Sequence, residues 1–283
     1  MTQRESRNNL LRHGAIGAAL LVMIAGLTVV GGESVSGQSP TGNPINLDNY
    51  RQTFGDEFDT LDVSSKGPGT RWTAHTPWNG DFGSARFLDP TPDGPFKVAN
   101  GVLTIKMQRG PDGKWGSGIL SSADPSGNGF QQGGGYFEMR AKFPEGAGVW
   151  PAFWLGSLGG PNDLKPEVDA VEYYGADNKG YYANLHLWQN GKDLYHRSAR
   201  IAIPAGAATS DYHLYGVSIA PDFITIYFDR QPVAQFPSRP EFMQRMMLLT
   251  NLAAGGGWPI DGMPDPSVMQ IDYIRAYQPK NSG

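Results

Sequence analysis

The sequence predicts an all-β protein built as a two-sheet antiparallel sandwich. Its 283 residues include 38 Gly and 22 Pro, which is typical of many short strands joined by tight turns. Apolar and polar residues alternate in most segments, and only short stretches, such as SRPEFMQRMM from Ser238, could be helical. Because an alternating strand gives one face to a core and the other to solvent or a cleft, two such sheets are expected to pack face to face.

The N-terminal 37 residues differ from the rest of the chain. Arg4, Arg7 and Arg12 precede an uncharged run, residues 14–32, and small residues follow it. A basic segment, an apolar segment and a small-residue exit are the order of a secretory signal peptide. We expect residues 1–37 to be this signal and the protein to be secreted or periplasmic in a bacterium. The alternative is an uncleaved membrane anchor, since about 17 to 25 apolar residues can span a bilayer.

One domain is expected after the leader. Residues 38–49 are rich in Pro, Gly and Asn and predict a linker, and residues 50–283 predict a single β domain. The DRQP step at 229–232, between two apolar runs, predicts a hairpin. Strands are expected in the alternating segments 101–108, 134–144, 181–188, 223–236 and 269–278.

Charge and motif content exclude several classes of function. The net charge is −4 and no Lys/Arg-rich stripe is present, so the footprint of a nucleic-acid binder is missing. The chain has no cysteine, and it contains neither GxSxG nor HExxH. Thiol, serine-elbow and zinc-protease chemistry are therefore not indicated.

The segment EVDAVE, residues 167–172, places three carboxylates in an apolar strand pattern. Side chains alternate along a strand, so Glu167 and Asp169 share a face while Glu172, five positions on, faces away. One extra residue in a β-bulge at Ala170 and Val171 would return Glu172 to the face of the others. We expect this bulge, with Val168 and one bulge residue packed behind the acidic stripe.

Paired carboxylates suit glycoside hydrolysis. Retaining enzymes need two carboxyl groups about 5 to 5.5 Å apart, one as nucleophile and one as acid and base. Crowded like charges raise the pKa of one member, so it stays protonated and can serve as the acid. Two other interpretations remain: a solvated acidic face, or a cluster that binds Ca²⁺.

The chain resembles glycoside hydrolase family 16, the laminarinase, agarase and carrageenase type of endo-β-glycanase. The resemblance covers about residues 53–278 and rests on the motifs FGDEFDTLD, NGVLTIK, GGGYFEMRAKFPEGAGVWPAFWL, EVDAVEYYG, LLTNLAAGGGWP and MQIDYIRAY. It implies a concanavalin A-like β-jelly roll with a concave cleft, retention of configuration, and no cofactor for catalysis. It further implies that Glu167 is the nucleophile, Glu172 the acid and base, and Asp169 the carboxylate that orients both. The six-residue spacing resembles the bulged ExDxxE branch.

Aromatic residues predict a substrate platform. Trp150 and Trp154 are four apart in VWPAFWL and so share a strand face, where flat indole rings could contact sugar rings, although core packing is the alternative. The resemblance further implies that other residues bind the sugar: Trp78 with Asn79, His186, Asn251 and Trp258. For His186, a hydrogen-bonded structural role is the alternative.

The resemblance also implies a structural Ca²⁺ far from catalysis, with Asp272 and the carbonyl of Gly101 as ligands; a hydrogen-bonded Asp272 is the alternative. The expected partner is a β-linked polysaccharide, and the expected state is a monomer. Ile119 and Leu120 stand where many laminarinases carry a basic residue, so the polymer is left open. A transglycosylase and a non-catalytic carbohydrate-binding protein are the alternative functions.

Overall fold

The computed structural model describes residues 40, 42–78, 80–160 and 162–280. The signal peptide or membrane anchor expected at residues 1–37 lies outside these residues. Among the helices of the described part, none is long and apolar enough to cross a membrane.

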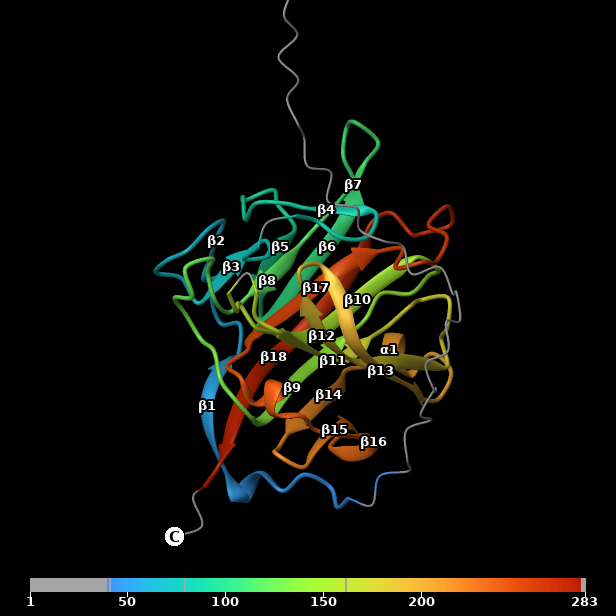
Figure 1. The fold of residues 1–283 in the computed structure, drawn as a ribbon. Helices are drawn as coiled ribbons and strands as arrows, with labels where there is room; N and C mark the ends of the chain where they lie inside the picture. Colours follow the sequence, from blue (N-terminus) through green and yellow to red (C-terminus); the bar gives the residue numbers. More distant parts are fainter. Residues whose placement is uncertain (1–39, 41, 79, 161, 281–283) are drawn as a thin grey trace, which may run out of the picture.

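The described chain forms two large sheets, as the sequence predicted (Figure 1). One sheet follows the order β16-β15-β14-β9-β18-β6-β7-β4, with β1 added beside β18 and β5 beside β6; the other follows β13-β12-β11-β10-β17-β8-β3-β2. Pairing is antiparallel except for two short parallel pairs, β2 with β3 and β4 with β7. The strands of the first sheet are β1 (Tyr50–Asp56), β4 (Ala85–Phe87), β5 (Phe96–Ala99), β6 (Val102–Arg109), β7 (Trp115–Ser117), β9 (Gly135–Lys142), β14 (His213–Ile219), β15 (Phe223–Phe228), β16 (Gln231–Pro237) and β18 (Ser267–Pro279). Those of the second are β2 (Val63–Ser64), β3 (Trp72–Ala74), β8 (Ile119–Ser121), β10 (Val149–Gly156), β11 (Lys165–Glu172), β12 (Gly180–Gln189), β13 (Lys192–Ala202) and β17 (Met247–Ala254).

The main hydrophobic core contains side chains from both sheets. In β10, Val149, Phe153 and Leu155 enter this core, while Ala152 and Trp154 belong to a separate apolar cluster on the opposite face. The predicted alternation of VWPAFWL is therefore confirmed. The eight-stranded sheet thus has one face in the sandwich and a second face that is free to build a site.

The turn between β15 and β16 and the few helical segments can both be compared with the prediction. Asp229 and Arg230 both have positive φ, 49° and 62°, which matches the two-residue turn of the β15–β16 hairpin predicted at DRQP. Within the described residues, helical structure is limited to one short α-helix, α1 (Ala207–Ser210), and two 3₁₀ turns, η1 (Leu47–Asn49) and η2 (Pro240–Met243). The helix indicated from Ser238 is therefore only the single turn η2.

The described part of the segment expected to be a linker lies on the ten-stranded sheet. Ile45 and Leu47 pack against a cluster of buried tyrosines, and the Ile45 amide donates a hydrogen bond to the carbonyl of Arg230 at 3.1 Å. These contacts bury apolar side chains, so residues 45–49 extend the folded domain.

Candidate active site

Strand β11 presents Glu167, Asp169 and Glu172 to the free face of the eight-stranded sheet. Its pairing with β12 shifts register between Asp169 and Glu172, and its pairing with β10 shifts at the same place. The shift is the expected bulge. Ala170 and Val171 are both fully buried in the main core, where we expected only one of them to pack. The extra buried residue returns Glu172 to the acidic face.

Glu172 is held by three hydrogen-bond donors. Its Oε1 accepts from Trp150 Nε1 at 2.9 Å and from the Tyr174 hydroxyl at 3.2 Å, and its Oε2 accepts from the Asn184 amide. Two of these donors follow from strand alternation, because Tyr174 is two residues after Glu172 and Asn184 is two residues before His186. Neither donor was predicted from the sequence, although the two-residue spacing of a strand face indicates both.

The protonation of the three carboxylates is coupled. Burial, and next the charge of Asp169, raise the pKa of both Glu167 and Glu172 above the usual value for Glu. Hydrogen bonds from Trp150 and Asn184 act in the opposite direction on Glu172, since donors stabilise a carboxylate. The cluster therefore favours binding at least one proton near neutral pH, as an acid catalyst requires.

His186 lies between two carboxylates. Its Nδ1 is 2.7 Å from Asp193 Oδ2 and its Nε2 is 3.5 Å from Asp169 Oδ2. Burial by itself would lower its pKa, but the hydrogen bonds to Asp169 and Asp193 raise the pKa of His186 to about 11. An imidazole with a carboxylate at each nitrogen carries two protons and is a cation.

The same cluster is the only group of three or more acidic or histidine side chains in the described part with the spacing of a metal site. The ligand atoms of Glu167, Asp169 and His186 lie within 4.8 Å of one another. Both ring nitrogens of His186 already face carboxylates, so a metal ion here would have to compete with these contacts and displace a proton.

Aromatic side chains line the neighbouring part of this face. Trp150 stacks on Tyr174 with ring centroids 5.7 Å apart, and Trp78 lies 6.0 Å from Trp154. Phe82 packs edge-on against both Trp150 and Trp154. Trp154 is buried under this layer, whereas Trp78 is 47% exposed and Trp150 is half-buried. Trp78 and Trp150 therefore offer open ring surface, and Trp154 supports them.

The loop after β17 adds an aromatic rim. Trp258 is 38% exposed and lies 6.2 Å from the ring of Tyr174. Gly256, at φ +59°, allows this approach, because a Cβ there would come within 2.9 Å of the Trp150 ring and 2.5 Å of Tyr174. Gly256 is thus required by the packing of the rim, whereas Gly255 and Gly257 of GGGWP are favoured by their positive φ.

The remaining predicted site residues differ in their placement. Asn251 has no exposed surface: its Oδ1 accepts from Trp154 Nε1 at 2.8 Å and its amide donates to the carbonyl of Trp150 at 3.3 Å. Its contact with the face is therefore through the two tryptophans, not by direct exposure to a sugar. Asn79 lies outside the described residues.

The expected calcium ligands do not fit a divalent cation well. Asp272 Oδ2 accepts a hydrogen bond from Arg140 Nη1 at 2.6 Å, so this carboxylate already has a cationic partner. Gly101 has φ +73° and sits in the turn before β6. A calcium ion would have to compete with Arg140 for the only carboxylate of the expected pair.

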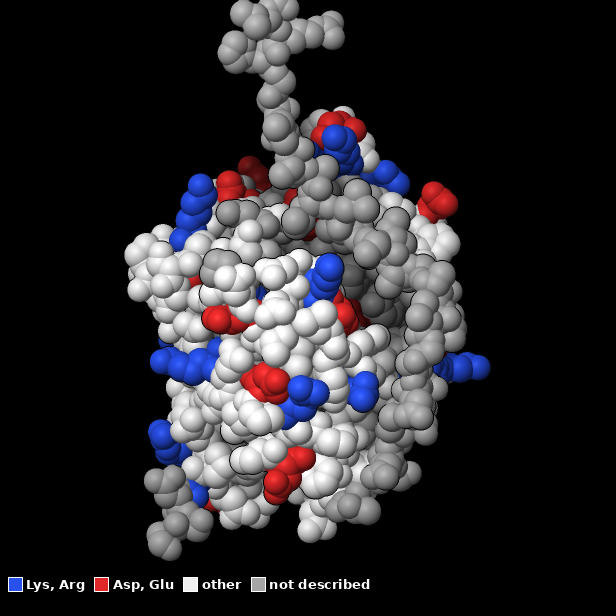
Figure 2. Space-filling model, in the orientation of Figure 1, with Lys and Arg blue, Asp and Glu red and all other residues white. Residues whose placement is uncertain are grey.

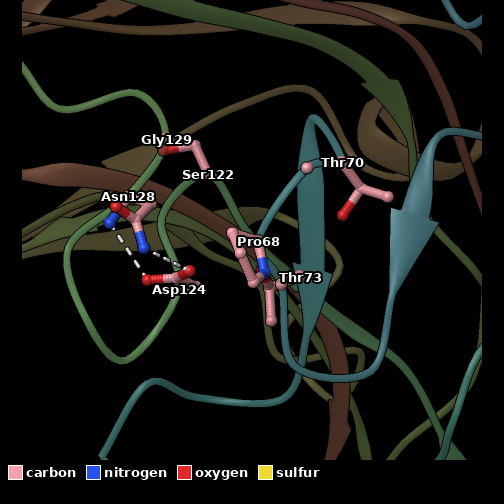
Figure 3. Close-up of a pocket in the computed structure, with 9 residues that line it drawn as sticks. Pro68, Thr70, Thr73, Ser122, Asp124, Asn128 and Gly129 are labelled. Carbon is pink, nitrogen blue, oxygen red and sulfur yellow. Dashed lines mark hydrogen bonds between the residues drawn. The ribbon is translucent and has the colours of Figure 1, made fainter.

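Two further surface features lie apart from the carboxylates. A cavity of about 240 Å³ lies between residues 67–73 and the loop after β8. Asn128 there donates hydrogen bonds to Asp124 from its backbone amide and its side chain (Figure 3).

Acidic and basic side chains are mixed over the face shown in Figure 2, without a broad patch of one sign.

Comparison with known proteins decides the family. Residues 91–275 match the family model described as glycosyl hydrolases family 16. The chain belongs to this family. The chain is 33% identical over 284 residues to the endo-1,3-1,4-beta-glycanase ExsH of Rhizobium meliloti. The match covers 89% of this chain and 58% of that protein. It is 34% identical over 249 residues to EglC of the same organism, an endo-1,3-1,4-beta-glycanase, covering 80% and 51%. The chain thus spans little more than half the length of these curated relatives.

Solved structures of family 16 proteins have the same fold. The laminarinase catalytic domain of Thermotoga maritima superposes with a TM-score of 0.66 at 23% identity, over 82% of this chain and all of that domain. The laminarinase of Rhodothermus marinus gives 0.66 at 24% identity, over 82% and 98%. The jelly-roll sandwich implied by the sequence motifs is confirmed.

Proposed function

We propose that the chain is an exported endo-acting β-glycosidase that hydrolyses internal bonds of a β-linked polysaccharide with retention of configuration. The observation that carries this proposal is the bulge in β11, which brings Glu167, Asp169 and Glu172 to one face beside exposed tryptophans. A binding protein would need the aromatic rings but not a crowded carboxylate cluster with raised pKa values.

In the first step, Glu167 attacks the anomeric carbon while Glu172 donates its proton to the glycosidic oxygen, so the leaving sugar departs as an alcohol. The product is a glycosyl ester of Glu167. Glu172, now ionised, then removes a proton from water as the water attacks the anomeric carbon and releases Glu167. Two inversions give net retention.

Neighbouring residues support these roles. Burial and the charge of Asp169 raise the pKa of Glu172, as the acid requires, and the cationic His186 acts in the opposite direction on Glu167, where it favours the ionised carboxylate that the nucleophile requires. The ring of Trp150 can pack on a sugar face while its N–H holds Glu172 in place. The Trp150 side chain thereby links the position of the sugar to the position of the acid, Glu172.

The substrate class is inferred from the relatives. Both R. meliloti proteins are named endo-1,3-1,4-beta-glycanases, and a neighbour of known structure is described as a non-specific endo-beta-1,3(4)-glucanase. We therefore propose a β-glucan, or a bacterial polysaccharide with β-1,3 or β-1,4 linked units, as the polymer.

The test is release of reducing ends from laminarin, mixed-linkage β-glucan and bacterial exopolysaccharides. Glu167→Gln and Glu172→Gln should each lower kcat by about 10²-fold or more, the typical contribution of a positioned acid or base. The control is Glu57→Gln, which removes a surface ion pair with Arg275 and should leave kcat unchanged. NMR of the first-formed anomer should show retention.

Three results would contradict the proposal. Activity of either glutamine variant within tenfold of wild type would exclude that residue from catalysis. Products longer than the substrate would indicate a transglycosylase. Binding of a polymer without release of reducing ends by the wild type would indicate a carbohydrate-binding protein.

A further inference from the structure

His186 is enclosed by charged and aromatic neighbours from three strands. Besides Asp169 on β11 and Asp193 on β13, its ring stacks against Trp188, with centroids 5.3 Å apart, and against His196, 4.6 Å apart and inclined by 12°. The ring therefore has little freedom to turn, and its two nitrogens keep their separate partners.

A second bulge aims Asp193 at this ring. Leu187 pairs with Tyr195 and Trp188 pairs with Asp193, so Leu194 is an extra residue in β13. Leu194 is 56% exposed. In a regular strand Asp193 would face away from His196, three positions later; the extra residue brings both onto the side of His186. The backbone amide of Tyr195 donates to Asp193 Oδ1 at 3.2 Å and fixes the carboxylate.

We propose that Asp193 is a positioning residue of the active site, which holds His186 as a cation with Nε2 directed at Asp169. The inference deepens the proposed function and rests on it. Asp193 acts through His186 and need not contact the sugar. Its role is to keep one positive charge beside the catalytic carboxylates over the working pH range.

The charged groups around His186 explain how its positive charge acts on the catalytic carboxylates. Glu167 and Asp169 face it from β11, and Asp193 and His196 face it from β13. Burial and the charge of His186 lower the pKa of His196, which favours its neutral form. The charge of His186 lowers the pKa of Glu167 and Glu172, against burial and Asp169, which raise it.

The direct test is Asp193→Asn. The amide can still accept from Nδ1 but has no charge. Because burial lowers the pKa of His186 and Asp193 makes the shorter of its two carboxylate contacts, that pKa should fall from about 11 into the working range. The neutral ring would then no longer oppose burial and Asp169, and the pKa values of both glutamates should rise. The pH profile of kcat/KM should move to higher pH by about one unit, the effect of one nearby charge, so that the acidic limb falls about tenfold. Asp193→Glu restores a carboxylate and should return the profile towards wild type.

The chain offers a matched control. His213 Nδ1 lies 2.7 Å from Asp229 Oδ2 on the other sheet, the same contact at the same distance. Asp229→Asn keeps a residue that tolerates the positive φ of that turn. It should leave the pH profile of activity in place.

A second readout does not need activity. ¹⁵N NMR of the histidine rings gives the pKa of His186 in wild type and in both Asp193 variants, and thermal unfolding checks that each variant is folded. A lower pKa of His186 in Asp193→Asn together with a displaced pH profile supports the inference. An unchanged pKa, or a lower pKa with an unmoved profile, overturns it. A wild type without glycosidase activity would end the proposed function, and the NMR titration would still decide whether Asp193 holds His186 as a cation.

Discussion

At the scale of single residues, Trp150 would join substrate contact to acid catalysis in the proposed mechanism. Its Nε1 donates to Glu172 at 2.9 Å, and its ring stacks on Tyr174. The hydrogen bond lowers the pKa of Glu172, because it stabilises the carboxylate more than the acid. The same side chain thus limits the pH up to which Glu172 keeps its proton.

We predict that Trp150→Phe moves the alkaline limb of the activity profile to higher pH. Phe keeps an aromatic surface but has no donor, so the pKa of Glu172 should rise and the acid should stay protonated longer. KM should increase because the ring is smaller. The check is kcat/KM and kcat from pH 5 to 10, and an alkaline limb that moves to lower pH would contradict the assigned effect.

At the scale of elements, the bulge in β11 decides which face Glu172 occupies. Ala170 and Val171 are both in the core, and these two residues of β11 lie opposite a single residue of β12, Ala183. Deleting one of them would leave a regular strand in which Glu172 still shares a face with Glu167, because their separation becomes four.

Two deletions therefore have opposite expected results. Deleting Ala170 should lower stability by about 1 kcal/mol or more through lost packing and preserve measurable activity. Deleting both Ala170 and Val171 makes the separation three, turns Glu172 away and should abolish activity. Thermal unfolding and reducing-end assays on the two variants test this; equal activities would contradict the role given to the bulge.

At the scale of the whole molecule, the active site reduces the stability of the fold. Folding raises the pKa of Glu167 and Glu172, so each carboxyl contributes stability that is fully present below its unfolded pKa and is lost as pH rises through the folded pKa. The carboxylate cluster is therefore most unfavourable in alkaline solution.

We predict that Glu167→Gln raises the melting temperature more at pH 9 than at pH 4. The amide is similar in size and removes a charge that repels Asp169. At pH 4 the wild-type carboxyl is already protonated, so the variant should change little there. Thermal unfolding at both pH values tests the sign, and an equal shift at both would show that repulsion in the cluster does not limit stability.

Local patterns determined much of this protein. Alternation in VWPAFWL separated core from site residues, the DRQP step indicated the β15–β16 turn, and the odd spacing of Glu167 and Glu172 required a bulge. These features depend on the period of a strand and on turn chemistry, which act between residues close in sequence.

Only the tertiary structure decided which partners each side chain has. The family resemblance implied that Asn251 binds the sugar, yet strand order places it under Trp150 and Trp154. Asp193 reaches His186 only because β13 pairs with β12 and carries its own bulge. Such contacts depend on which strands become neighbours and in what register, and these are set by packing of the whole sandwich rather than by any one segment.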